Sequence, residues 1–246
     1  MEFEQSEPSQ PAPESLVLHY PLAPVWVTYV LLALNILIFI PTWLLGDELP
    51  SAGGLIPEAV IGKWQLWRLV TAGFLHGGPT HLLFNMYALY ILGQDTEKLF
   101  GSGRFLCVYL SALIGGNLVV TLLSPLDRTT IGASGAILGL LGALVAYFWQ
   151  YRDHVAGARA HLTNLVTTAL INVGLGLLPS ISLWGHLGGV LAGLLAGWGL
   201  LPRYRVDYEP SPRLLRLPFG PPEVMGIGRV VVGCLVLWGL ALWLRG

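Results

Sequence analysis

The sequence predicts an all-α polytopic membrane protein with seven transmembrane helices. Hydrophobic residues make up 54% of the 246 residues, and only 11% are charged, against about 25% in an average soluble domain. Several uncharged stretches are also long enough for a membrane crossing, which needs about 20 mostly apolar residues. A soluble domain with this composition would lack the charged residues that cover its surface.

The same numbers exclude other classes of protein. The 13 basic and 14 acidic residues leave a net charge of −1, so the chain has no basic face for nucleic acid. Its high hydrophobicity excludes a disordered chain. The two cysteines, Cys107 and Cys234, are too few for a disulfide framework. We therefore expect the lipid bilayer, and no nucleic acid, as a partner.

The first four spans are predicted from single uncharged stretches. Their apolar segments cover residues 25–45, 81–94 (within the uncharged stretch 69–94), 105–126 and 129–151. The segment from Gly46 to Trp67 is too long for a simple turn. It contains Trp64 and Trp67, and tryptophan favours membrane interfaces. We expect this segment to be partly helical and to lie on the outer leaflet.

The last three spans are interrupted by a proline or a charged residue. The stretch from Ala160 to Pro202 is uncharged over 43 residues, which suits two spans. Pro179-Ser180 is the expected break, because proline ends a helix. The seventh span covers 230–244 and extends back to Val224 if Arg229 snorkels toward the headgroups. The expected organisation is a core over 23–202, a cytoplasmic linker over 203–223 and a seventh helix over 224–246.

Positive charge predicts which way the spans point, because cytoplasmic loops carry more Lys and Arg. With a cytoplasmic N-terminus, nine of the 13 basic residues lie inside and four lie outside. Residues 1–22 then form a cytoplasmic tail, which begins with acidic residues unlike a signal peptide. The C-terminus lies outside. Since the sequence has no targeting peptide and no appended soluble domain, we expect a prokaryotic inner membrane.

Polar residues inside spans are costly and therefore informative. The second, fourth and sixth spans all run inward, and they begin near His81, Ser134 and His186. Each of these residues lies within about two turns of the outer end of its helix, so the three share one shallow layer of the membrane. Asn85 follows His81 by four residues and lies on the same helix face.

Glycines predict that the fourth and sixth spans touch, because small residues let helix backbones approach closely in lipid. Generic helix packing is the alternative interpretation, since glycine is common in membrane helices. The glycines of these two spans include Gly132, Gly135, Gly139 and Gly142, and then Gly185, Gly188, Gly189, Gly193 and Gly197.

A serine and a histidine in contact can act as a nucleophile and its base. Ser134 would attack a carbonyl as His186 takes its proton. His81, Asn85 and the backbone N–H of Ser134 can donate hydrogen bonds to the oxyanion that forms. No acidic residue lies at this depth, so we expect a Ser–His dyad, with neither a metal nor a cofactor. Taken alone, Ser134 is more simply a helix N-cap and His186 a packed histidine.

The sequence resembles the rhomboid family of intramembrane serine proteases. Gly132-Ala133-Ser134-Gly135 matches the motif GxSG, and His186 with Gly189 and Gly193 matches HxxGxxxG. His76, His81 and Asn85 match the pattern HxxxxHxxxN, and Trp67-Arg68 match the Trp-Arg pair of the first external loop. The resemblance covers about residues 25–202, and the extra C-terminal span resembles the family's six-plus-one form.

The resemblance implies a serine endopeptidase that cuts single-span membrane proteins near their outer end. It implies that Ser134 is the nucleophile and His186 the general base. Leu138 stands where some rhomboids place a tyrosine that stacks on the base histidine, which leaves the orientation of His186 open. The other roles that it implies are oxyanion binding by His81, Asn85 and the Ser134 amide, and support by His76, Gly132, Gly135, Gly189, Trp67 and Arg68.

Three other functions stay open. A zinc protease could use His76, His81 and His186, but the sequence lacks an HExxH pairing and a nearby acid. A catalytically inactive rhomboid-like protein could bind client helices, although such relatives typically lose the serine or the histidine. A transporter would need charged residues or broken helices at mid-membrane.

Overall fold

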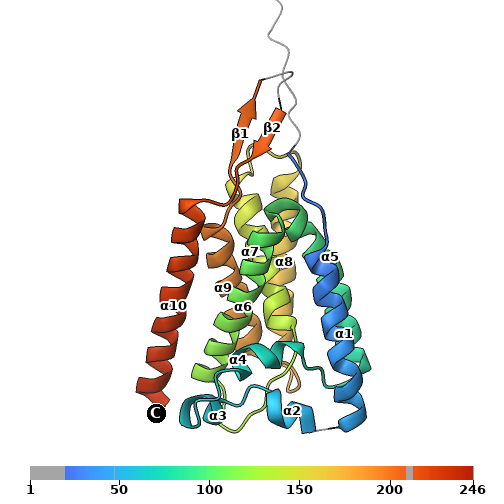
Figure 1. The fold of residues 1–246 in the computed structure, drawn as a ribbon, viewed down its shortest axis with the longest axis vertical. Coiled ribbons are helices and arrows are strands. Elements are labelled where there is room, and N and C mark those ends of the chain that lie inside the picture. Colours follow the sequence, from blue (N-terminus) through green and yellow to red (C-terminus); the bar gives the residue numbers. More distant parts are fainter. Residues whose placement is uncertain (1–19, 47, 209–212, 246) are drawn as a thin grey trace, which may run out of the picture. The chain divides into compact units, whose positions relative to one another are not determined.

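The computed structural model describes residues 20–46, 48–208 and 213–245, so nearly all of the predicted tail over 1–22 lies outside the described residues. The chain divides into two units: Leu22–Pro202 with Pro218–Gly246, and Met1–Pro21 with Arg203–Leu217. The first unit is helical (Figure 1). Among the described residues its helices of 17 residues or more are α1 (Val27–Leu45), α5 (Pro79–Phe100), α6 (Ser102–Leu123), α7 (Ser134–Gln150), α8 (Ala158–Leu175), α9 (Leu183–Gly199) and α10 (Pro221–Arg245).

Each predicted span coincides with one of these helices. The predicted break at Pro179-Ser180 is confirmed, because α8 ends at Leu175 and α9 begins at Leu183. α10 has 25 residues and includes Arg229, so the seventh segment is one continuous helix. Within the described part of the chain, α1, α6 and α10 are long and apolar enough to cross a membrane, and α7 is a shorter apolar helix. The described part of the fold is thus mostly helical and contains several apolar helices, which agrees with a polytopic membrane protein.

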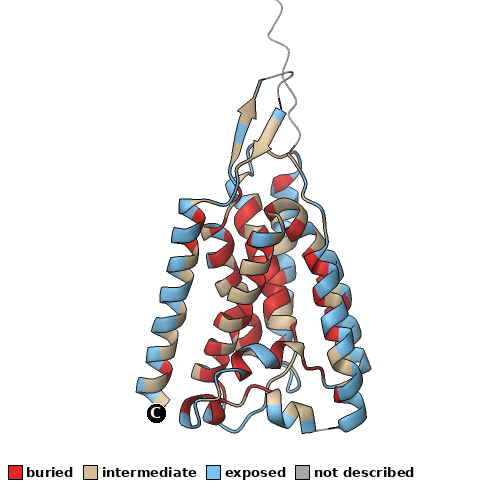
Figure 2. Cartoon of the chain, viewed as in Figure 1, coloured by how far each residue is buried: buried red, intermediate tan, exposed pale blue. Residues whose placement is uncertain are grey.

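α7 is the central helix of the larger unit, and 11 of its 17 residues are buried. The buried residues gather on α7 and its neighbours, whereas α10 is mostly exposed (Figure 2). Three glycines of α9, Gly189, Gly193 and Gly197, pack directly on the backbone of α7. A Cβ atom on Gly189 would lie 2.1 Å from the Gly135 carbonyl oxygen, and one on Gly193 would lie 2.0 Å from that of Gly139. The predicted contact between these two helices is confirmed, and it leaves no room for side chains at these glycines.

The segment between α1 and α5 is partly helical, as predicted. It contains α2 (Glu48–Gly53), α3 (Pro57–Gly62), α4 (Arg68–Thr71) and the 3₁₀ helix η1 (Ala72–Phe74). Leu55 and Thr130 exchange two backbone hydrogen bonds of 2.9 Å. The Gly132 N–H donates to the Ala72 carbonyl, also at 2.9 Å. These bonds attach the segment to the loop that precedes α7.

Glu97, near the C-terminal end of α5, caps the N-terminus of α1. Its fully buried carboxylate accepts backbone N–H bonds from Trp26, Val27 and Thr28 at 3.1, 2.9 and 2.8 Å. The Thr28 and Ser102 hydroxyls also donate to it, each at 2.7 Å. The first N–H groups of a helix lack partners within the helix, and a negative charge is favourable there. One side chain therefore fixes α1 to α5.

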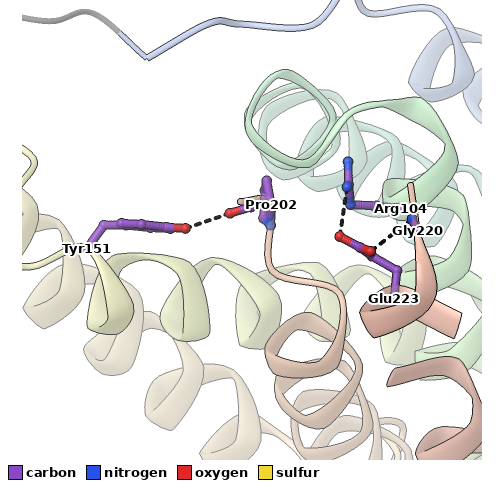
Figure 3. A network of polar contacts seen from close by, with 5 residues as sticks. All are labelled: Arg104, Tyr151, Pro202, Gly220 and Glu223. Atoms are coloured by element: carbon purple, nitrogen blue, oxygen red, sulfur yellow. Dashed lines mark hydrogen bonds and ion pairs between the residues drawn. The ribbon is translucent and has the colours of Figure 1, made fainter. Parts of the chain in front are cut away.

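α10 is fixed to the remaining helices near its start by a buried ion pair. Arg104 on α6 donates to Glu223 at 2.9 Å, and the Gly220 N–H donates to the same carboxylate at 2.9 Å (Figure 3). Gly226 also packs against α9, since a Cβ atom there would lie 2.1 Å from the Gly199 carbonyl oxygen.

The far end of α10 is held by Arg245. Its guanidinium donates to the carbonyl oxygens of Thr121 at 2.9 Å and Ser124 at 2.6 Å, at the end of α6. Between these two attachments α10 is poorly covered, because only Glu223, Gly226 and Ala241 are buried among its residues.

The smaller unit contains a β-hairpin that the sequence pattern does not predict. Strands β1 (Tyr204–Asp207) and β2 (Arg213–Arg216) pair antiparallel, with Tyr204 opposite Arg216. Asp207 and Arg213 form an ion pair of 2.8 Å across the strands. Part of the predicted linker over 203–223 is therefore ordered. Four-residue strands carry too little alternation to stand out in a sequence.

Candidate active site

Ser134 is the first residue of α7, and Gly132 sets the turn that leads to it. The backbone φ of Gly132 is +122°, a conformation that L side chains rarely adopt. A Cβ atom at Gly132 would also lie 2.7 Å from His81 Nε2 and 4.0 Å from Ser134 Oγ. Both the backbone conformation at this position and the lack of space for a Cβ atom therefore favour glycine. Ser134 is not a capping residue, since Ala133 holds the N-cap position and no side-chain capping bond is made.

His186 faces Ser134 from α9. Its Nε2 atom lies 3.2 Å from Ser134 Oγ, and the residue is 7% exposed. Ser182 caps α9, accepting a 3.1 Å bond from the Gly185 N–H. The close packing of α9 on Gly135 brings the two helix ends together, which allows the short histidine–serine contact.

The other ring nitrogen of His186 defines its tautomer. Nδ1 lies 2.8 Å from the backbone carbonyl oxygen of Asn172. A carbonyl only accepts, so Nδ1 carries the proton, and in the neutral ring Nε2 is left to accept from Ser134. Asn172 lies in the last turn of α8, where carbonyls lack partners within the helix. The Gly176 N–H, which could have bonded Asn172, instead donates to Val173 at 3.0 Å.

Asn172 was not predicted from the sequence, because a backbone carbonyl has no sequence signature. Its bond orients His186 without the aromatic ring that some rhomboids place at the position of Leu138. Leu138 is 5% exposed and packs in a cluster with Leu141 and Ala169, which joins α7 to α8.

His81 lies on the first turn of α5, beside the Gly132 turn. The Gly77 N–H donates to its Nδ1 atom at 3.3 Å, so in the neutral ring Nε2 carries the proton and can donate on the Ser134 side. Asn85 is 6% exposed and donates to the His81 carbonyl at 2.9 Å, a bond that uses one of its two amide hydrogens. The structure thus brings His81 to the nucleophile and places Asn85 one turn further along α5.

His76 is buried against His81. The two rings meet edge to face with centroids 5.1 Å apart, and His76 is 2% exposed. Among the described residues, neither ring nitrogen of His76 has a hydrogen-bond partner. Its position fits a supporting role beside His81 rather than contact with Ser134.

Arg68 and Trp67 differ in their surroundings. Arg68 is 7% exposed and donates to the Gln65 side chain at 2.6 Å and to the carbonyls of Ser51 and Gly54 at 3.0 and 2.5 Å. It therefore holds the segment between α1 and α5 together. Trp67 is 53% exposed, as expected for a residue at a membrane interface.

The arrangement suits acyl transfer. A neutral imidazole nitrogen faces a serine hydroxyl, and the first N–H groups of α7 and the His81 ring supply donors nearby. In the described part of the chain, no three His, Cys, Asp or Glu side chains are grouped so that they could hold a metal ion.

The fold and the site together define a helical membrane protein with a serine–histidine pair at the ends of two packed helices. Residues 63–203 match the Rhomboid domain. The chain is 38% identical over 182 residues to Rhomboid protease GluP of Bacillus subtilis (strain 168), and 34% identical over 171 residues to RHOMBOID-like protein 5 of Arabidopsis thaliana. The chain belongs to the rhomboid family.

The alignments cover more of this chain than of its relatives. They include 72% of the chain but 35% of GluP, and 67% of the chain but 54% of RHOMBOID-like protein 5. The chain thus spans roughly a third to a half of the length of these two proteins. The relative named as a rhomboid protease supports intramembrane serine protease chemistry at the level of the family.

Proposed function

We propose that this protein is an intramembrane serine endopeptidase that cleaves transmembrane segments of other membrane proteins near their outer end. The observation that carries the proposal is the orientation of His186. One ring nitrogen lies 3.2 Å from Ser134 Oγ and the other is held 2.8 Å from the Asn172 carbonyl. A base with a fixed tautomer beside a serine is the arrangement that nucleophilic catalysis requires.

The proposed reaction proceeds in two stages. Ser134 Oγ attacks the substrate carbonyl carbon as His186 Nε2 takes the hydroxyl proton. The Asn172 carbonyl stabilises the imidazolium through Nδ1, the role that an aspartate has in a triad. His186 then gives the proton to the leaving amine. In the second stage His186 takes a proton from water as the water oxygen attacks the acyl carbon. His186 then returns this proton to Ser134 Oγ as the ester C–O bond breaks and the second product leaves as a carboxylic acid.

The oxyanion of each stage would be bound by fixed donors. The Ser134 N–H is among the first N–H groups of α7, which have no partner within the helix. His81 Nε2–H lies beside the same turn, and the second Asn85 amide hydrogen supplies a third donor. Donors of this kind act mainly in the transition state.

The proposed topology has seven spans, with the N-terminus in the cytoplasm and the C-terminus outside. The continuous helix α10 and the nine-to-four distribution of basic residues support it. The membrane that we propose is a prokaryotic inner membrane. A reporter that fluoresces only in the cytoplasm, fused to the C-terminus, should stay dark. A bright reporter would contradict the crossing by α10.

The decisive experiment compares the purified wild-type protein with Ser134→Ala and His186→Ala on a panel of tagged single-span substrates in liposomes. Each variant should lose several orders of magnitude in turnover, and the double variant should be no worse than either single one, because the two residues act as a unit. A serine-directed fluorophosphonate should label only proteins with Ser134. Equal cleavage by wild type and Ser134→Ala would contradict the proposal, and binding of substrates without cleavage by wild type would instead indicate an inactive relative.

A further inference from the structure

The end of α8 departs from the α-helical pattern of hydrogen bonds. The last four carbonyls of a helix have no partner within it, unless the chain tightens. Here the N–H groups of residues 176–178 each donate to the carbonyl three residues earlier, within 173–175, at 3.0, 3.1 and 3.0 Å. This is the 3₁₀ pattern that often closes a helix. Among the last four carbonyls of α8, that of Asn172 is the one that these bonds skip, and it lies 2.8 Å from His186 Nδ1.

Gly176 is the residue at which the pattern changes. In a regular α-helix its N–H would donate to Asn172, four residues earlier, but it donates to Val173 instead. The change leaves the Asn172 carbonyl to His186. The φ of −63° and ψ of −11° at Gly176 lie in the right-handed helical region, which any residue adopts. The backbone conformation therefore does not explain why this residue is a glycine.

The space around Gly176 does explain it. Gly176 is buried, and a Cβ atom there would lie 2.6 Å from the Cα atom of Leu183 and 2.9 Å from the Val173 carbonyl oxygen. Leu183 is the first residue of α9. Gly174, two residues earlier, is exposed and has nothing within 4 Å of an added Cβ atom. Of these two glycines, Gly176 is thus the one that lets the end of α8 approach the start of α9.

This approach controls the bond to the base. Leu183 precedes His186 by three residues, so the contact at Gly176 and the bond from Asn172 join the same two helix ends. Carbon atoms in ordinary contact are at least about 3.5 Å apart, so a Cβ atom at Gly176 would push these backbones apart by about 0.9 Å. The 2.8 Å bond would then measure about 3.7 Å, which is too long for a hydrogen bond. We propose that Gly176 is a positioning residue that keeps the Asn172 carbonyl on His186 and so fixes the tautomer of the base.

The tautomer of His186 tests the proposal, because it reports the bond without any reaction. The measurement is ¹⁵N NMR of the full chain in detergent, with labelled histidine and at a pH where the imidazole is neutral. The spectrum of His186→Ala identifies the signals of His186. Wild type should carry the proton on Nδ1, whereas Gly176→Ala should show both tautomers. Gly174→Ala, the matched control at the same end of α8, should keep the wild-type tautomer.

The inference rests on the proposed function, so the labelling rate of Ser134 by a small fluorophosphonate is measured on the same samples. Gly176→Ala should react about tenfold more slowly than wild type, as expected when a hydrogen bond to a charged group is lost. Gly174→Ala should react at the wild-type rate. A small fluorophosphonate does not need the route of a transmembrane substrate, so its rate reports the site and not substrate entry.

Two results would overturn the proposal: a wild-type tautomer in Gly176→Ala, or equal labelling rates of the two alanine variants when wild type is reactive. If Gly176→Ala does not fold, glycolic acid in place of Gly176 removes the N–H donated to Val173 without adding a Cβ atom. This variant should also show both tautomers, and a wild-type spectrum would again overturn the proposal. The expected tautomers in a wild-type protein that the fluorophosphonate does not label would support the role of Gly176 and contradict only the proposed protease activity.

Discussion

At the residue scale, Gly132 has two constraints that glycine alone satisfies. Its φ of +122° lies in a region that costs other residues on the order of 1–3 kcal/mol, and a Cβ atom would lie 2.7 Å from His81 Nε2. Gly132→Ala is expected to push His81 away from the oxyanion and to lower kcat by up to ~100-fold, as for the loss of another oxyanion donor. Gly103→Ala is the control, since nothing lies within 4 Å of its added Cβ atom. Steady-state cleavage rates that are equal in both variants would contradict this role of Gly132.

The Asn172 carbonyl requires a backbone substitution, because no side chain makes the bond to His186. Replacing Val173 by its α-hydroxy acid turns the 172–173 amide into an ester, whose carbonyl is a weaker acceptor. The loss of about 1 kcal/mol of hydrogen bonding to His186 should lower kcat several-fold. The same replacement at Val166 also removes one helix N–H but affects a carbonyl far from His186 in the sequence of α8. A similar kcat for both esters would show that the Asn172 bond does not orient the base.

At the scale of elements, the carboxylate of Glu97 links two helices. It accepts five hydrogen bonds, four from the start of α1 and one from Ser102. Glu97→Gln removes the charge and turns an amide NH₂ toward N–H donors, so we expect a loss of about 2–4 kcal/mol in the free energy of unfolding. Asp95→Asn is the matched control, because Asp95 is an exposed acid on the same helix. Thermal unfolding in detergent should separate the two variants, and a small effect of Glu97→Gln would mean that the cap adds little.

Hydropathy predicts where the helices lie, but it does not predict which backbone groups meet. The break at Pro179 and the contact between α7 and α9 follow from local rules about proline and small residues. The pairing of Ser134 with His186 follows from the shared depth of two polar residues in apolar helices. The Asn172 carbonyl and the Glu97 cap depend on how helix ends pack in three dimensions, and the short strands of the hairpin carry almost no pattern. These features therefore needed the structure.

At the scale of the whole helical unit, the last turn of α8 holds His186 through the Asn172 carbonyl, and we expect the same turn to border the route by which substrate enters. Under the proposed function, a transmembrane substrate has to reach Ser134 sideways, between helices. Only two residues of α8 are buried, Ala158 and Ala169, and the helix packs on α7 and α9. Its last turn leads through Gly174 and Gly176 into the loop whose Pro179 carbonyl accepts from Arg128 at 2.9 Å. We expect the ends of α5 and α8 next to the site to separate when substrate enters.

Separation of α8 from α5 would also break the hydrogen bond that orients His186, because Asn172 lies in the last turn of α8. An outward shift of its last turn takes the carbonyl away from His186 Nδ1, now at 2.8 Å. A bond of this length is lost when its atoms separate by about an ångström. If substrate enters by this separation, the conformation that admits it does not hold His186, and catalysis follows only after α8 returns.

This coupling makes a prediction that cross-linking can test. With Cys107 and Cys234 replaced by alanine, cysteines are introduced at Phe84 on α5 and Leu175 on α8, which are 68% and 44% exposed. In the cross-linked state, cleavage of a transmembrane substrate should stop, because the helix ends cannot separate. Labelling of Ser134 by a small fluorophosphonate should continue at close to the uncross-linked rate, because the Asn172 carbonyl still orients His186. Reduction should restore cleavage. Full cleavage in the verified cross-linked state would exclude this entry route, and loss of labelling would show that the cross-link distorts the site instead of closing it.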